Sequence, residues 1–428
     1  MVHCFDLGTG KLEIRPIARV YGIVNLYKDV KYPGNAHHLE DKLSLLENQA
    51  AGIIRKIHDS LPRGRFQIER KDLDVLRKFI QIMCYRKQTL YFDDAHPDNS
   101  MGAEFLNSLR ESKGLDDGIE VWLHFLDYFL KTPHQDLVNR AYHFQHKVDF
   151  NTMFRSMFGS CWPSNVTAED FIANDYNHLA SHFHLGVVEA ADGAEFVMSN
   201  NSFGLWEGTM DGLPDVHRLF ILSPRVALIL RSNLIAENSP RSHSIIVRSA
   251  LIDIQIRRVQ IRFSNGRVDM SVDELLRHRA SAAGQRDEAN FKITKLTERQ
   301  TQNMNAIVLL NAKKDGSVTF LSKDAMHKTV EKYVALREPL VAENRSLCAS
   351  LMGQLTNGVE EAPSTPLGHS AQSLNQIVHR ILCATWARGE MTSFPAFSNR
   401  SRYPRVLLLF PMFSSAQISR RISDFMHF

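Results

Sequence analysis

Apolar side chains recur every three or four residues through much of the first half of the chain, which is the spacing of amphipathic helices. The segments with this spacing are residues 39–61, 70–90, 119–130 and 135–158. Thr167 to Asp170 has the pattern of a capping box and predicts a further helix that continues to about His184. The N-terminal half is therefore predicted to be mostly helical.

The pattern changes to short, strand-like apolar runs between residues 195 and 231. Residues 195–199, 219–222 and 226–230 are the apolar runs, and they predict a short antiparallel sheet formed around residues 185–231. Three glycines lie between the first two runs, at positions 204, 208 and 212. They predict a loop that carries Trp206 and Glu207 on its surface. The fold class predicted is α+β, with the helices packed on the sheet.

Other elements are predicted outside these stretches. They are an opening hairpin in residues 3–27, a hairpin at Asn265-Gly266, a polar loop or short surface helix at 278–289, strands at 291–297 and 316–321, and helices at 297–310 and 323–336. We expect residues 1–345 to form a single domain. Residues 346–428 contain no lysine and are richer in proline and serine, which predicts a linker near 353–372 and a weakly ordered tail.

Composition excludes several classes of protein. The net charge is only +4 and the basic residues are spread along the chain, so there is no strong signal for nucleic-acid binding. The five cysteines are far apart and contain no Cys-x-x-Cys pair, as in proteins of reducing compartments. No signal peptide and no apolar run near the roughly 20 residues of a membrane span are present. We expect a soluble intracellular protein, cytoplasmic or nuclear, whose cofactors and partners the sequence leaves unknown.

Polar residues at two places are candidates for chemistry. Glu40 and Glu47 lie seven residues apart, so they share one side of the first helix, and Arg86 lies near the end of the second. Ser199, Asn200 and Asn201 follow a predicted strand and could present hydrogen-bonding groups to a ligand. Border carboxylates are commonly solvated and a basic residue at a helix end suits the helix dipole, so a purely structural reading stays open.

A metal site is a weaker alternative. Asp175, His178, His182 and His184 share the helix predicted to end near residue 184, and the spacing of four between two histidines is found in helical zinc sites. The glutamate of a His-Glu-x-x-His motif is absent and no cysteine is nearby, so no metal is assigned.

An ordered series of segments resembles the domain-of-unknown-function family 4238, in its fungal form. The segments are FDLGTGKLEIRPIARV, LEDKLSLLENQAAGIIRKI, ERKDLDVLRKFIQIMCYRKQ, EFVMSNNSFGLWEG, HRLFILSPRVALIL and KITKLTERQTQNMNAIVLLN, which cover roughly residues 3–335. The family usually opens with a His-x-x-Pro segment, which has no counterpart here, so we expect upstream sequence to be missing. The family pattern falls on Glu40, Glu47, Arg86 and Asn305, while Asn200 stands where members commonly carry an aspartate and Ser202 where they carry a proline.

No activity is established for that family, so the resemblance implies a fold and a polar cluster but no reaction. We expect Glu40, Glu47, Arg86, Ser199, Asn200 and Asn201 to converge at the strand end. The leading hypothesis is a ligand- or protein-binding module of unknown role. The alternatives are a metal- or carboxylate-dependent, hydrolase- or nuclease-like enzyme and a degenerate inactive family member, so whether the chain is an enzyme is left open.

Overall fold

The structure is a computed structural model. It describes residues 1–16, 20, 34–86, 110–147, 167–200, 202–210, 213–235, 247–267, 269–312, 316–335 and 339–356. Parts of the predicted helices at 70–90 and 135–158, the candidate residue Asn201, and the predicted tail beyond residue 356 lie outside these ranges. No helix of the described ranges combines the length and the hydropathy needed to cross a bilayer.

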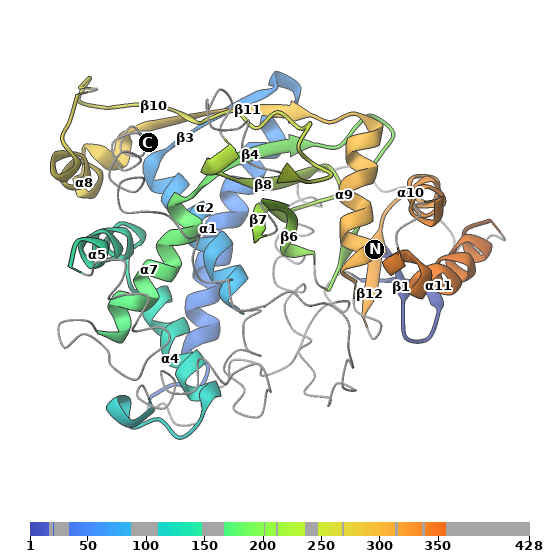
Figure 1. Cartoon of the computed structure of the whole chain (residues 1–428), viewed down its shortest axis with the longest axis horizontal. Helices are drawn as coiled ribbons and strands as arrows, with labels where there is room; N and C mark the ends of the chain where they lie inside the picture. Colours follow the sequence, from blue (N-terminus) through green and yellow to red (C-terminus); the bar gives the residue numbers. More distant parts are fainter. Residues whose placement is uncertain are drawn as a thin grey trace.

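The helical N-terminal half is confirmed. Its helices are α1 (His38–Ser60), α2 (Arg70–Arg86), α4 (Gly118–Lys131), α5 (His134–Lys147) and α7 (Ala168–Ser181). They lie together on one side of the molecule (Figure 1). The apolar stripe of α1 is buried in this group, because Leu39, Leu43 and Ile54 are almost wholly inaccessible. The capping box of Thr167 and Asp170 opens α7 as predicted.

The larger sheet is wider than expected, with eight described strands. In spatial order these are β10 (Gln260–Arg262), β11 (Glu288–Lys295), β4 (Phe183–Glu189), β8 (Val226–Ser232), β7 (Leu213–Ile221), β6 (Phe203–Met210) and β9 (Val247–Arg248), while β3 (Arg65–Glu69) also pairs with β11. The β11–β4 pairing is parallel and the others are antiparallel. The sheet is therefore mixed. Strand β11, which makes the parallel pairing, begins more than 50 residues after β8 ends.

Both faces of this sheet are covered. Along β8, Leu228 and Leu230 pack into the core shared with the helices, whereas Ala227 and Ile229 pack into a second core on the opposite face. Alternate side chains of a strand point to opposite faces, so a strand covered on both sides has to be apolar throughout. All seven residues of β8 are accordingly buried.

A smaller four-stranded sheet forms part of the second layer. It has the order β2 (Lys11–Arg15), β1 (Val2–Asp6), β12 (Ser317–Phe320) and β5 (Met198–Ser199), and helices α9 (Glu298–Leu310), α10 (Lys323–Ala335) and α11 (Pro339–Thr356) lie on the same side of the molecule (Figure 1). The opening hairpin is thus present as β1 and β2. Helix α11 spans the predicted domain limit at residue 345, and its Leu351 is buried in the second core.

Two local expectations were wrong. Helix α7 ends at Ser181, so His184 lies in β4 and not on the helix. The turn at Asn265-Gly266 does not join two paired strands, because the partner of β10 is β11. Of the two alternatives for residues 278–289, a polar loop or a short surface helix, the structure has helix in part: the end of α8 (Val272–Ala280) and the short helix η7 (Gly284–Arg286), followed by the start of β11.

Candidate functional site

The two charged residues predicted on the first helices form a buried ion pair. Arg86 Nη1 lies 2.9 Å from Glu47 Oε1, and the two side chains are only 4% and 6% exposed. The apolar stripe of each helix faces the other, so polar groups on that side are drawn into the interface. A buried charge is tolerated when it is paired and hydrogen-bonded, and this pair meets that condition.

Glu40 lies two turns before Glu47 on α1 and is half-buried. Burial raises the pKa of its carboxyl group, and the negative charge of Glu47 raises it further, while Arg86 opposes both effects. The charges of Glu47 and Arg86 therefore both act on Glu40, and we call these three residues the charged cluster. The ion pair brings Glu47 and Arg86 together, while their role as a candidate site stays a prediction.

The strand-end residues form a tight polar turn. Ser202 Oγ donates to the Ser199 carbonyl at 2.9 Å and accepts from the Ser199 N–H at 3.1 Å, and the Ser202 N–H also donates to that carbonyl. A proline at position 202 could not make the last of these bonds, because it has no N–H. The side chain of Asn200 packs against Gly316, and its Oδ1 is buried without a donor.

Asn305 holds the segment before this turn in place. Its Oδ1 accepts from the Val197 N–H at 3.1 Å, and its Nδ2 donates to the Glu195 carbonyl at 2.8 Å and to Thr329 Oγ1 at 3.2 Å. The side chain is completely buried. All of its partners belong to the fold, so its role is to join α9 and α10 to the chain that enters β5.

The end of α2 lies against the start of β6, the strand that follows the polar turn. The rings of Phe79 and Phe203 make an edge-to-face contact with centroids 5.9 Å apart. A Cβ added to Gly204 would lie 2.7 Å from the sulfur of Cys84. This contact brings the last turn of α2, where Arg86 lies, toward the polar turn. Convergence of the charged cluster with Ser199 and Asn200 at one ligand stays a prediction.

The expected surface loop around Trp206 and Glu207 is wrong, because both residues lie in strand β6. Gly204 and Gly208 have positive φ angles of 71° and 80°, and the register of β6 against β7 shifts beside each of them. Glycines in this conformation produce β-bulges as readily as turns. Trp206 stacks under Arg218, with the guanidinium carbon 3.1 Å from the ring centroid.

Glu207 belongs to a buried network with His217, Ser249 and Arg231. Glu207 Oε2 lies 2.9 Å from His217 Nδ1 and accepts from Ser249 Oγ at 2.7 Å, and Arg231 Nε donates to His217 Nε2 at 2.8 Å. Burial lowers the pKa of His217, with the charge of Arg231 acting in the same direction and Glu207 opposing.

This network resembles a catalytic triad in composition only. In a triad the histidine presents a free ring nitrogen to the nucleophile and its other nitrogen to the carboxylate. Here the lone pair of His217 Nε2 accepts from Arg231, and Ser249 and Glu207 both lie at Nδ1. His217 therefore cannot take a proton from Ser249, and the network ties β6, β7 and β8 together.

The weaker alternative of a metal at Asp175, His178 and His182 is not supported by the described residues. The rings of His178 and His182 do approach, with centroids 5.0 Å apart. No group of three histidine, cysteine, aspartate or glutamate side chains within the described ranges is arranged to hold a metal ion. His182 is the C-cap residue of α7, and its N–H donates to the His178 carbonyl.

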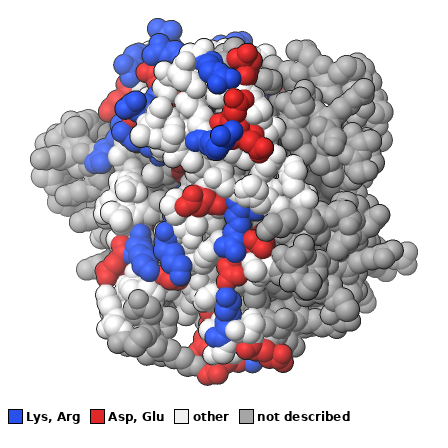
Figure 2. Space-filling view, turned by 90° about the vertical axis from the view of Figure 1, so that its left-hand side faces the viewer, with Lys and Arg blue, Asp and Glu red and all other residues white. Residues whose placement is uncertain are grey.

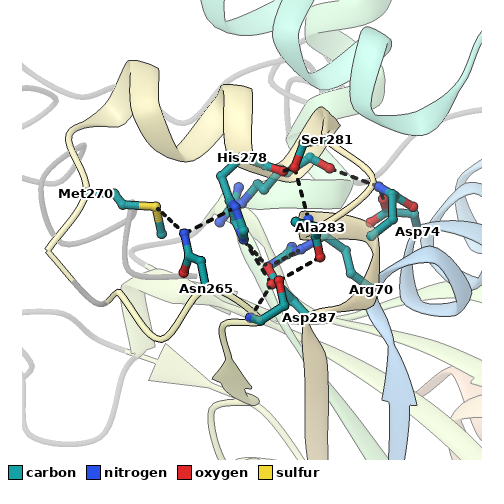
Figure 3. A network of polar contacts seen from close by, with 12 residues as sticks. Arg70, Asp74, Asn265, Met270, His278, Ser281, Ala283 and Asp287 are labelled. Carbon is teal, nitrogen blue, oxygen red and sulfur yellow. Dashed lines mark hydrogen bonds and ion pairs between the residues drawn. The ribbon is translucent and has the colours of Figure 1, made fainter.

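A second polar network, absent from the sequence predictions, surrounds Asp287 (Figure 3). Asp287 is fully buried and accepts from Arg70 Nε at 3.1 Å, from the Ser264 N–H at 2.9 Å, and lies 2.9 Å from His278 Nε2. Burial alone would raise the pKa of Asp287, but these hydrogen bonds outweigh it and the pKa is lowered. The capping box of Ser271 and Glu274 would have revealed α8, whereas the pairing of Arg70 with Asp287 joins residues 217 apart.

Comparison with known proteins gives one match. A family described as a protein of unknown function, DUF4238, matches residues 1–324, which is three quarters of the chain. No curated protein matches the chain. No solved structure matches it either.

Proposed function

The chain belongs to the DUF4238 family, and from this premise we propose that it is a binding module whose ligand is a small, donor-rich molecule at the charged cluster. The observation that carries the proposal is the excess of carboxylate over basic groups among the described residues there. Glu47 and Arg86 form an ion pair, while Glu40 adds a second, half-buried carboxylate on the same face of α1. A ligand with an amine or several hydroxyl groups would supply the donors that a carboxylate requires.

The polar turn supports the same class of ligand. Asn200 Oδ1 is a buried acceptor without a donor, and such atoms are rare enough in folded proteins to need an explanation. It lies close to the start of β6, the strand against which the end of α2 packs. A donor-rich ligand that reaches both Glu40 and Asn200 would satisfy two acceptors at once.

A carboxylate-dependent hydrolase is the second candidate. The raised pKa of Glu40 is the property that a general acid needs near neutral pH, and this single observation favours an enzyme. The inactive relative is the third candidate, because Asn200 stands where family members commonly carry an aspartate. The binding module accounts for both the carboxylate excess and the unsatisfied amide, so we rank it first.

The test compares thermal unfolding of the wild type with that of Glu40→Gln, Glu47→Gln and Arg86→Met. Loss of either partner removes the buried counter-charge that the other has in the ion pair, so we expect Glu47→Gln and Arg86→Met to lose about 3–5 kcal/mol of stability. Glu40→Gln should melt higher than the wild type at pH 7. The raised pKa of Glu40 means that its ionised form opposes folding, so this gain should disappear as the pH falls below the ordinary pKa of a glutamate.

Ligand probes separate the candidates. We expect spermidine or agmatine to raise the melting temperature of the wild type and of the exposed-carboxylate control Glu13→Gln, but not of Glu40→Gln. Stabilisation by Mg²⁺ or Mn²⁺ that depends on Glu40 would favour the enzyme instead. A lower melting temperature for Glu40→Gln, with no response to any probe, would show that the cluster is structural and would overturn the proposal.

A further inference from the structure

Among the described residues, buried and half-buried basic side chains outnumber acidic ones where α2 begins, α5 begins and α8 ends. Arg70, Arg77 and Arg279, which we call the arginine cluster, lie there, together with Lys78 of α2. The acidic groups that act on Arg279 are Asp74 and Asp287. The surface that carries α5 and α8 shows basic and acidic groups interspersed among its described residues (Figure 2).

The two acidic groups are already engaged. The carboxylate of Asp287 is hydrogen-bonded to Arg70, to His278 and to the Ser264 N–H. Asp74 Oδ2 accepts from Gln285 Nε2 at 3.2 Å, and its Oδ1 lies 3.8 Å from His134 Nε2. Neither carboxylate therefore serves as the acceptor for Arg279.

Two of the other cations are satisfied by backbone carbonyl groups. Arg77 donates to the carbonyl of Ala180. Lys78 Nζ donates to the carbonyls of Leu130 and Thr132, both at 2.8 Å. These bonds provide acceptors but no negative charge, so the cluster keeps its positive excess.

Arg279 carries two unsatisfied donors. The residue as a whole has intermediate exposure, yet its Nε and Nη2 are buried and find no acceptor among the described residues. These two nitrogens form one edge of the guanidinium group and donate in parallel, which is the geometry that matches two oxygens of a carboxylate or phosphate. Arg70 Nη2 is also buried without a hydrogen bond, although it lies 3.1 Å from Asp287 Oδ2 as an ion pair.

We propose that the arginine cluster binds a small oxyanion, with the Nε–Nη2 edge of Arg279 holding two of its oxygens and Arg70 Nη2 donating to it. The anion would supply acceptors to the buried donors of Arg279 and offset the positive charge that Arg70 and Arg77 place near it. This site is separate from the charged cluster. Arg70 and Arg86 are the first and last residues of α2, and a helix of 17 residues places them about 24 Å apart.

The electrostatics of the cluster agree with an absent counter-charge. Burial lowers the pKa of Arg279 to about 9, and the nearby Arg70 and Arg77 lower it further. Burial likewise lowers the pKa of Arg77 to about 10 and that of Lys78 to about 8. A bound oxyanion would favour the charged form of each of these groups.

The experiment titrates inorganic phosphate into the full chain and follows the melting temperature, with sodium chloride at matched ionic strength as the reference. We expect phosphate to raise the melting temperature of the wild type beyond the effect of chloride. Arg279→Met should lose this shift, with an apparent Kd for phosphate at least tenfold weaker. The matched control is Arg277→Met on the exposed side of the same helix, which should keep the wild-type response.

One further variant and two further probes complete the test. If Arg279→Met does not fold, Arg279→Lys keeps a positive charge without the paired donors, and it should also weaken phosphate binding at least tenfold. A parallel titration with acetate and citrate distinguishes a carboxylate ligand from a phosphate, and either response supports an oxyanion site. Equal shifts with phosphate and chloride, no shift in the wild type, or a full shift in both Arg279 variants would each overturn the proposal.

Discussion

Asn305 illustrates how a single polar side chain can be fully determined by its surroundings. Its amide oxygen accepts one hydrogen bond and its amide nitrogen donates two, to three partners from two different segments. The family pattern pointed to this position as part of a polar cluster. The structure assigns it a supporting role, because each bond joins parts of the fold and none of these bonds is directed at the charged cluster.

We predict that Asn305→Leu destabilises the protein by about 2–4 kcal/mol, because it removes the partners of the buried Val197 N–H and Glu195 carbonyl. The matched control is Asn303→Leu on the same helix, where the side chain donates to the Ala250 carbonyl near the surface, and this change should cost less than about 1 kcal/mol. Chemical denaturation of both variants measures the difference. Equal losses of stability would contradict the assigned role.

At the scale of elements, β6 shows why glycine spacing predicted the wrong structure. Gly204 and Gly208 were interpreted as loop breakers, and both have the positive φ angle that such an interpretation requires. Both nevertheless lie in a strand. Glycine is required there because neighbouring residues approach too closely for any side chain. A Cβ on Gly208 would lie 2.9 Å from the Cβ atoms of Ser249 and Val216. Close approach and turn formation select the same residue type, so local pattern cannot separate them.

We predict that Gly208→Ala lowers stability by about 2–5 kcal/mol, as the sum of the left-handed backbone cost and the clash with two neighbouring side chains. Gly193→Ala is the control for the backbone term alone, because Gly193 has a φ angle of 69° and nothing within 4 Å of an added Cβ. Its expected cost is about 1–2 kcal/mol. Similar melting temperatures for the two variants would argue against close packing at Gly208.

For the whole molecule, the burial of histidines between layers has a consequence for acid stability. Burial lowers the pKa of His134 to about 4, that of His182 to about 3 and that of His184 to about 4. In the unfolded chain these groups bind protons near the ordinary value of 6.5. Below that pH the unfolded state therefore binds more protons than the folded state, and stability falls.

We predict that the melting temperature falls steadily between pH 6.5 and pH 4.5, with His134 and His182 each contributing up to about 2–3 kcal/mol of the loss at the acid end. His134→Gln should flatten this profile, whereas His146→Gln, at an exposed position of the same helix, should leave it unchanged. Carboxylates with lowered pKa, such as Asp287, lose their contribution only at lower pH. A melting temperature that is constant over this interval would disprove the argument.

Local patterns in the chain were sufficient for the class of fold, for the helices of the N-terminal half and for the capping box of α7. Each of these depends on residues close in sequence or on one helix face packing against the next. The mixed sheet, the position of Glu207 in β6 and the pairing of Arg70 with Asp287 depend on contacts between residues far apart in the chain. Only the tertiary structure decided these features, because contacts between residues far apart in the chain produce no repeating pattern of apolar and polar residues in the sequence.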